Sequence, residues 1–340
     1  MTEEYDLCFC GDVYTYDPSN LFIGEKLEKI FSNSKYVIAN LETPIVVNKE
    51  LKPMNKYSAL KTKPEIVDFL KKMNVKAVSL ANNHIMDYGV IAADYTKEIL
   101  SKENIINYGY GKTIEEAFSP CTLNVKRKKI GLIGLTTTYV PEALSKKDKP
   151  GVAGIRVVTK VNLDPREVLE EPAPPYIVKG EILKEDMKFL KKIIQDSKKK
   201  IDYLIIHSHW GVGLAPYNKV VLEYVKELAK NIIDFGGDMI VGGHPHAIQP
   251  IESYKGKLIF YSLGNFIFHP LMHEMENLGL VIGVRLDNRV IDIYFAVQKN
   301  NAVEVLDNIR ESVEIQYFKY LASANKVELK ETNSHFELTF

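Results

Sequence analysis

The chain has 340 residues, of which 46% are hydrophobic and 26% charged, so it is neither a disordered, a collagen-like nor a disulfide-scaffold protein. At about 150 residues per domain, its length suggests about two domains. The 44 basic residues balance 44 acidic ones, giving a net charge of zero. Proteins that bind nucleic acid or anionic membranes usually carry a basic excess, so we expect no nucleic-acid partner.

The chain also lacks the sequence features of a membrane or secreted protein. No apolar run approaches the roughly 18 residues that a membrane helix needs, and the acidic N-terminus differs from a signal peptide. Cys8, Cys10 and Cys121 form no CxxC pair, and their odd number argues against a disulfide framework. We therefore expect a cytoplasmic protein without a membrane segment, in which Cys8 and Cys10 are buried thiols. The sequence leaves the oligomeric state open.

Apolar strands and amphipathic helices alternate along most of the chain, which favours an α/β fold. The short apolar runs predict strands over residues 5–10, 36–40, 75–81, 129–135, 203–207, 239–241 and 258–263, and a hairpin over 281–297. Helical spacing predicts helices over residues 21–32, 64–73, 90–102, 182–197, 216–235 and 312–324, and a capping box opens a short helix at Thr113.

Two segments depart from this alternation. Residues 138–180 contain many prolines, which interrupt regular structure, so they form a surface insertion that acts either as a lid or as a passive excursion. Residues 301–340 carry no readable motif. We therefore expect one catalytic domain over residues 1–300 and a C-terminal appendage over 301–340.

Small polar groups follow nearly every predicted strand. They are Asp12, Asn40 with Glu42, Asn82–His84 with Asp87, His207 with His209, His244 with His246, and Asn265. The carboxyl ends of the strands line the ligand crevice in an open α/β sheet, so these groups are expected to converge. Taken singly, Gly-Asp after a strand is explained as an ordinary turn, and Asn-Asn-His as an ordinary helix cap. The combination with two His-x-His pairs indicates a site for a first-row divalent metal, because imidazole, carboxylate and amide donors suit such ions.

Six motifs carry a family resemblance. They are Gly11-Asp12, Asn40-Leu41-Glu42, Ser79–His84 with Asp87 and Gly89, His209-Trp210-Gly211, Gly243–His246 and Tyr261–Phe266. Over about residues 5–300, the chain resembles the CapA family of bacterial capsule-synthesis proteins, which is associated with poly-γ-glutamate and is similar to the calcineurin-like metallophosphoesterases. The resemblance implies a four-layer α/β/β/α sandwich with a metal centre at one edge of the two sheets.

The resemblance also implies the site residues. One or two divalent ions, of manganese, iron or zinc, are expected. Asp12 and His246 would hold one ion, and Asn83, His209 and His244 the other, with Glu42 as the bridge. His84 would be the acid beside the substrate, oriented by Asp87. The residues expected to support these ligands or to face the substrate are Asn40, Asn82, His207, Asn265 and Arg156, although an ordinary surface position is the favoured interpretation of Arg156.

Two departures from the phosphoesterase pattern leave one metal position short of a ligand. Asp12-Val13-Tyr14 stands where those enzymes have Asp-x-His, and Glu42 replaces the bridging aspartate. The site is therefore expected to hold one tight and one weak ion, or a single ion.

The implied function is that of a metal-dependent hydrolase, in which a metal-activated hydroxide attacks a phosphoester and His84 protonates the leaving oxygen. The expected substrate is a small molecule or a γ-glutamyl polymer. Two alternatives stay open: a metal-dependent γ-glutamyl amide hydrolase, and a non-catalytic scaffold in poly-γ-glutamate synthesis or export.

Overall fold

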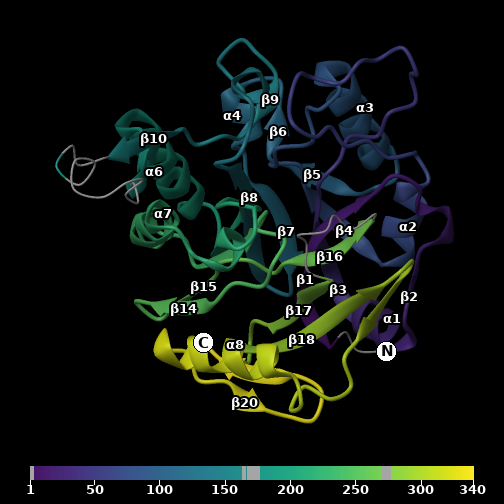
Figure 1. Ribbon diagram of the computed structural model, residues 1–340, viewed down its shortest axis with the longest axis vertical. Helices are drawn as coiled ribbons and strands as arrows, with labels where there is room; N and C mark the ends of the chain where they lie inside the picture. Colours follow the sequence, from purple (N-terminus) through teal and green to yellow (C-terminus); the bar gives the residue numbers. More distant parts are fainter. Residues whose placement is uncertain (1–3, 163–165, 167–176, 270–276) are drawn as a thin grey trace.

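Figure 1 shows the computed structural model of the protein, which describes residues 4–162, 166, 177–269 and 277–340. Two β-sheets pack face to face, and helices cover the outer face of each. The predicted four-layer α/β/β/α sandwich is therefore confirmed.

The first sheet has eleven strands and is built around its longest one. Its strands are β1 (Tyr5–Thr15), β2 (Phe22–Ile23), β3 (Ser34–Leu41), β4 (Val75–Ser79), β5 (Ile106–Tyr108), β16 (Asn265–His269), β17 (Leu278–Arg285), β18 (Val290–Lys299), β19 (Ala302–Val305), β20 (Lys330–Glu331) and β21 (Phe336–Thr339). β1 pairs parallel with β3 and β16 and antiparallel with β17. The carboxyl ends of β1, β3 and β4 therefore meet at one edge.

The second sheet has six strands, in the order β14-β15-β13-β12-β8-β7. Their bounds are β7 (Cys121–Val125), β8 (Lys128–Thr136), β12 (Tyr203–His209), β13 (Met239–Gly243), β14 (Ile251–Tyr254) and β15 (Lys257–Phe260). β8, β12, β13 and β15 run parallel to one another. Two small ribbons lie outside the main sheets: β6 (Tyr110–Gly111) with β9 (Gly151–Val152), and β10 (Val157–Asn162) with β11 (Ile177–Ile182).

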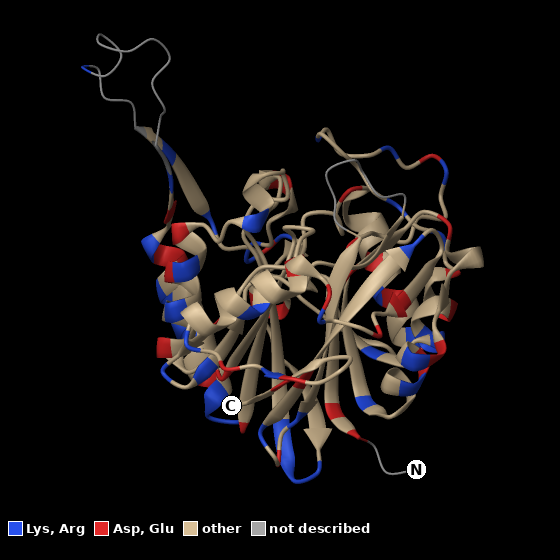
Figure 2. Cartoon of the chain, turned by 60° about the horizontal axis from the view of Figure 1, so that its bottom comes forward, with Lys and Arg blue, Asp and Glu red and all other residues tan. Residues whose placement is uncertain are grey.

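Alternation along the strands divides the core into layers, because successive side chains point to opposite faces of a sheet. Leu7 and Phe9 of β1 pack between the two sheets. Cys8 and Cys10 face the helices on the other side and are buried free thiols, as predicted. The outer helices are α1 (Glu25–Ser32), α2 (Ile66–Lys72) and α3 (Gly89–Lys102) on the first sheet, and α6 (Lys184–Lys198) and α7 (Glu223–Phe235) on the second. Basic and acidic residues are interspersed over these helices (Figure 2).

Local sequence signals explain several helix ends. The Thr113 hydroxyl accepts a hydrogen bond from the Glu116 backbone N–H and opens α4 (Ile114–Ala117), as the capping box predicted. Gly236 ends α7 at a φ of +121°, a conformation that favours glycine. The described residues also contain three short 3-10 helices, η1 (Pro18–Asn20), η2 (Pro141–Ala143) and η3 (Tyr217–Lys219).

Some predicted bounds were wrong, and strand pairing explains two of the differences. The strand predicted over residues 5–10 continues to Thr15 because β16, which the sequence analysis missed, pairs with its second half. The helix predicted from residue 21 begins at Glu25, since Phe22 and Ile23 form β2 against β19. The helix predicted from residue 216 begins at Glu223, after η3.

The last forty residues share the sheet and core of the rest of the chain. β19 and β21 both pair with β18, and α8 (Val313–Ala324) packs over the layer between the sheets. The rings of Phe318 and Phe336 contact the Phe295 ring, with centroids 5.6 and 5.8 Å away. Residues 301–340, predicted as an appendage, thus contribute to this core.

The proline-rich segment contains more regular structure than predicted, because its described part includes β9 and the β10–β11 ribbon. The proline cluster at 172–175 lies outside the described residues, and the two alternatives for residues 138–180, a lid or a passive excursion, both stay open. Within the part of the chain that the structure describes, no helix has the length and apolar character needed to cross a membrane.

Candidate metal centre

The polar groups that follow the strands come together across the edge shared by the two sheets. Ligand atoms of Glu42, His209 and His244 lie within 4.8 Å of one another, and so do those of Asp12, Glu42 and His246. Asp12 and Glu42 come from β1 and from the end of β3, whereas His209 ends β12 and His244 and His246 follow β13. Residues up to 234 positions apart therefore form two donor groups that share Glu42.

Asp12 is fixed by hydrogen bonds from both sheets. Its Oδ1 accepts from the Asn40 amide at 2.8 Å, and its Oδ2 accepts from the His244 backbone N–H at 3.0 Å. A Cβ atom at Gly243 would lie only 2.7 Å from Oδ1, so glycine is needed for this close approach. Asp12 is 1% exposed, which makes it a buried and oriented carboxylate donor.

Glu42 is the least satisfied group in the described centre. It is completely buried, and neither side-chain oxygen has a hydrogen-bond partner. Its Oε1 lies 3.3 Å from His209 Nε2 and 3.8 Å from His246 Nε2. Burial, together with the charge of Asp12, raises the pKa of Glu42 well above its usual range. A buried carboxylate without a partner is costly, and a cation between these groups would compensate it.

The histidines of the centre are suited to bind a cation. Burial lowers the pKa of the His209 imidazole to about 4 and that of His244 well below its usual range, so both rings are neutral at pH 7. Neutral imidazole is the form that binds metal. His209 Nε2 lies 2.8 Å from Asn83 Oδ1 and 3.1 Å from His244 Nδ1. Three donor atoms of the predicted ligand set thus face one another.

The backbone around the second histidine pair is strained. His244 has a φ of +93° and His246 a φ of +54°, a region that residues other than glycine rarely adopt. These residues follow β13, so the alternation rule that places residues of a strand on one face does not apply to them. The unusual backbone instead directs the His244 N–H toward Asp12.

His84 lies between the donor groups and a pair of charged side chains. Its Nδ1 is 2.6 Å from Asp87 Oδ2, and its Nε2 faces Glu42 Oε1 at 3.9 Å. Burial lowers the pKa of His84 to about 4, although Asp87 opposes this effect. The Lys56 ammonium contacts Asp87 Oδ1 at 2.7 Å and His84 Nδ1 at 3.3 Å. The sequence analysis missed Lys56, because it lies in an irregular segment and lysine is common in this chain.

The remaining predicted residues take different places. Asn82 donates to Asn40 Oδ1 at 3.0 Å and accepts from the His84 N–H at 3.1 Å, so it connects β3 with the His84 turn. Asn265 Oδ1 lies 2.9 Å from His246 Nδ1. His207 is outside both donor groups, and its Nδ1 lies 2.8 Å from the hydroxyl of Tyr108, a residue the sequence analysis also missed.

Arg156 pairs with a carboxylate that belongs to neither donor group. Its Nε and one terminal nitrogen donate to the Asp186 carboxylate at 3.1 and 2.6 Å, beside the β10–β11 ribbon. Half of the Arg156 side chain is exposed. This ion pair favours the surface role that the sequence left open for Arg156.

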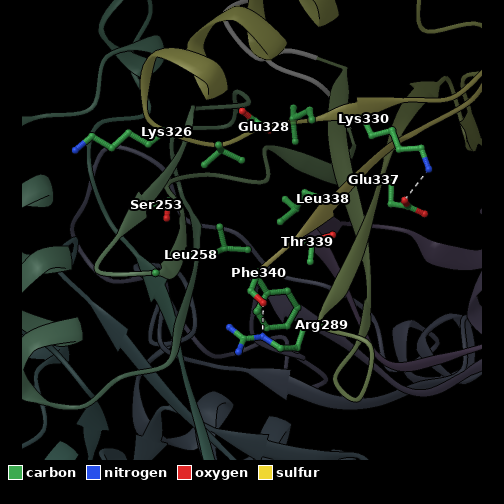
Figure 3. Close-up of a pocket in the computed structure, with 13 residues that line it drawn as sticks. Ser253, Leu258, Arg289, Lys326, Glu328, Lys330, Glu337, Leu338, Thr339 and Phe340 are labelled. Carbon is green, nitrogen blue, oxygen red and sulfur yellow. Dashed lines mark hydrogen bonds and ion pairs between the residues drawn. The ribbon is translucent and has the colours of Figure 1, made fainter.

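A cavity of about 600 Å³ lies elsewhere, between the β14–β15 hairpin and the C-terminal segment (Figure 3). Within it, Lys330 pairs with Glu337 at 3.2 Å and Arg289 donates to the Phe340 carbonyl oxygen. Its lining includes no member of the two donor groups.

Comparison with known proteins identifies relatives of the chain. Its residues 3–270 match the family model described as bacterial capsule synthesis protein PGA_cap. The chain is 34% identical over 247 residues to the PGA biosynthesis protein CapA of Bacillus subtilis (strain 168), covering 72% of this chain and 56% of that protein. It is 27% identical over 249 residues to the capsule biosynthesis protein CapA of Bacillus anthracis, covering 73% and 54%. The chain thus spans about half the length of these curated relatives.

A solved structure of a hypothetical protein from Thermus thermophilus aligns with a TM-score of 0.45 at 13% identity, covering 87% of this chain and 95% of that one.

The family match covers most of the chain and contains both donor groups. The chain belongs to the CapA family of bacterial capsule synthesis proteins.

Proposed function

We propose that this CapA-family chain is a metal-dependent hydrolase that cleaves a phosphoester in the metabolism of a capsule polymer of the poly-γ-glutamate type. The observation that carries the proposal is Glu42, a buried carboxylate with two unpartnered oxygens that belongs to both donor groups. The names of its Bacillus relatives, which refer to PGA and capsule biosynthesis, support the link to that metabolism.

The donor set fits one or two divalent ions of the manganese, iron or zinc class. Asp12 and His246 would hold one ion, and Asn83, His209 and His244 the other, with Glu42 between them. When bound, such ions supply Lewis-acid stabilisation of phosphoryl oxygens and lower the pKa of water toward neutrality.

The chain's own residues supply the proton for the leaving group. His84 presents Nε2 toward the donor groups and keeps Nδ1 against Asp87, so Nε2 is the atom that would protonate the leaving oxygen. The low pKa of His84 reflects burial without a substrate. An anionic phosphoester beside Nε2 would raise that pKa, because an opposite charge favours the protonated ring.

The test compares metal content with turnover. Chelator-treated protein is reloaded with manganese, its metal is quantified, and aryl phosphate monoesters, diesters and γ-glutamyl oligomers are offered as substrates. His244→Ala is expected to lose metal, whereas His84→Ala keeps metal and loses about 10²-fold or more in kcat on phosphoesters. His335→Gln, whose ring contacts include Thr332, Tyr294 and Asp292 and no member of the donor groups, is the histidine control.

Four outcomes contradict the proposal. Turnover restricted to γ-glutamyl oligomers indicates an amide hydrolase. Bound metal without turnover of any substrate favours the scaffold, and so does failure to bind metal at all. Unchanged metal content and activity in both histidine variants would mean that the site residues are wrong.

A further inference from the structure

Lys56 is a nearly buried cation beside His84. It lies in the irregular segment between β3 and α2, and its side chain is only 11% exposed. Its ammonium donates to Asp87 Oδ1 at 2.7 Å and to the Asn83 backbone carbonyl at 2.7 Å, and lies 3.3 Å from His84 Nδ1. Burying a lysine is costly, so a buried lysine with three close partners at a candidate site calls for an explanation.

Asp87 connects Lys56 to the rest of this segment. Its Oδ2 accepts from the Leu60 backbone N–H at 2.5 Å and contacts His84 Nδ1 at 2.6 Å. Its backbone carbonyl accepts from the Met54 N–H at 2.7 Å. Residues 54–60 are therefore attached to Asp87 at three points, and Lys56 supplies the positive charge that compensates this buried carboxylate.

The contacts of Lys56 leave its ammonium little capacity for a substrate anion. An ammonium has three donors, and Asp87 Oδ1 and the Asn83 carbonyl engage two of them. An ionised carboxylate only accepts hydrogen bonds, so the 2.6 Å contact between Asp87 Oδ2 and His84 Nδ1 favours a proton on Nδ1. His84 Nε2 is thereby the ring atom that faces the donor groups.

We propose that Lys56 is a positioning residue of this site: it holds the Asp87 carboxylate so that His84 keeps Nδ1 hydrogen-bonded and directs Nε2 at the leaving oxygen. This inference rests on the proposed function. Lys56 does not contact the substrate, so its effect depends on how much the leaving group needs a proton.

The kinetic test varies the leaving group. Manganese-loaded Lys56→Gln is compared with wild type on an alkyl phosphate, whose alcohol needs protonation, and on 2,4-dinitrophenyl phosphate, whose phenolate does not. We expect kcat to fall by about 10²-fold on the alkyl ester and little on the dinitrophenyl ester, with KM and metal content unchanged. Lys56→Arg, which keeps the charge, should recover part of the loss. Lys52→Gln, an exposed lysine of the same segment, is the control.

A second measurement is independent of turnover. In protein with ¹⁵N-labelled histidine, the His84 Nδ1 proton should give a downfield resonance, assigned by its loss in His84→Ala. We expect this resonance to disappear or shift in Lys56→Gln and to persist in Lys52→Gln.

Three results would overturn the role of Lys56. They are an equal loss of kcat on both esters, a rise in KM as the main effect, and an unchanged His84 resonance in Lys56→Gln. If wild type hydrolyses no phosphoester, the proposed function fails, whereas the resonance still decides whether Lys56 positions His84.

Discussion

Replacing Glu42 by glutamine should change stability in opposite directions with and without metal. The substitution keeps the shape of the side chain and removes its charge. In the metal-free protein, both Glu42 oxygens are buried without a partner and lie near Asp12. A buried, unpartnered charge costs more than a buried, unpartnered amide, so Glu42→Gln should stabilise the metal-free protein, by an amount on the order of 1–3 kcal/mol.

Bound metal should make wild type more stable than Glu42→Gln. An ion whose free concentration is 100 times its dissociation constant stabilises the folded protein by about 2.7 kcal/mol. An unfolding entropy of about 2.1 cal/mol/K per residue gives about 0.7 kcal/mol/K for this 340-residue chain, so wild type should gain about 4 °C in Tm. Glu42→Gln weakens both donor groups and should gain little.

The assay is thermal unfolding followed by circular dichroism, on chelator-treated protein and during a manganese titration. Glu50→Gln, which removes an exposed carboxylate, is the matched control. The reasoning is refuted if Glu42→Gln retains the full metal-dependent rise in Tm, or if it strongly destabilises the metal-free protein.

Three further predictions concern other parts of the molecule. Burial alone would raise the pKa of Asp238, but hydrogen bonds from two lysines and a backbone N–H lower it. Asp238→Asn should therefore cost about 1–3 kcal/mol at pH 7. Urea unfolding should show this difference shrinking as pH falls from about 3.9, where the unfolded carboxylate takes up its proton, toward the lower pH at which the folded carboxylate does. Gly243→Ala must displace the Asp12 carboxylate, so metal titration should show about 10- to 100-fold weaker binding in a folded protein. Phe336→Ala should cost about 3–5 kcal/mol in chemical unfolding, because this fully buried ring belongs to the core between the sheets; a cost below about 1 kcal/mol would mean that the C-terminal segment is dispensable.

Much of the fold and the convergence of the polar groups followed from strand alternation and from where the strands end. Residues two positions apart on a strand point to the same face, and His207 and His209 of β12 follow this rule. Both contact residues of the first sheet: His209 lies among the metal donors, and His207 contacts Tyr108 of β5. His244 and His246 show its limit, because they follow β13 with positive φ angles and reach the centre by a different local geometry.

Other features depend on long-range contacts that have no periodicity in the sequence. Lys56 is placed by the backbone hydrogen bonds of Met54 and Leu60 to Asp87, and neither bond involves a side chain of the segment itself. β16 pairs with the part of β1 that continues beyond Gly11-Asp12, a pair that in isolation predicts a turn.

β17, which pairs antiparallel with β1, affects whether the region matched by the family model can be produced on its own. The family match ends at residue 270, but β17 and β18 begin at Leu278 and Val290. A fragment ending at residue 270 would expose one hydrogen-bonding edge of the strand that carries Asp12, and would remove Ile282 and Phe295 from the core. Such an edge invites intermolecular strand pairing, so the shortened protein should aggregate even though every proposed ligand is present in it.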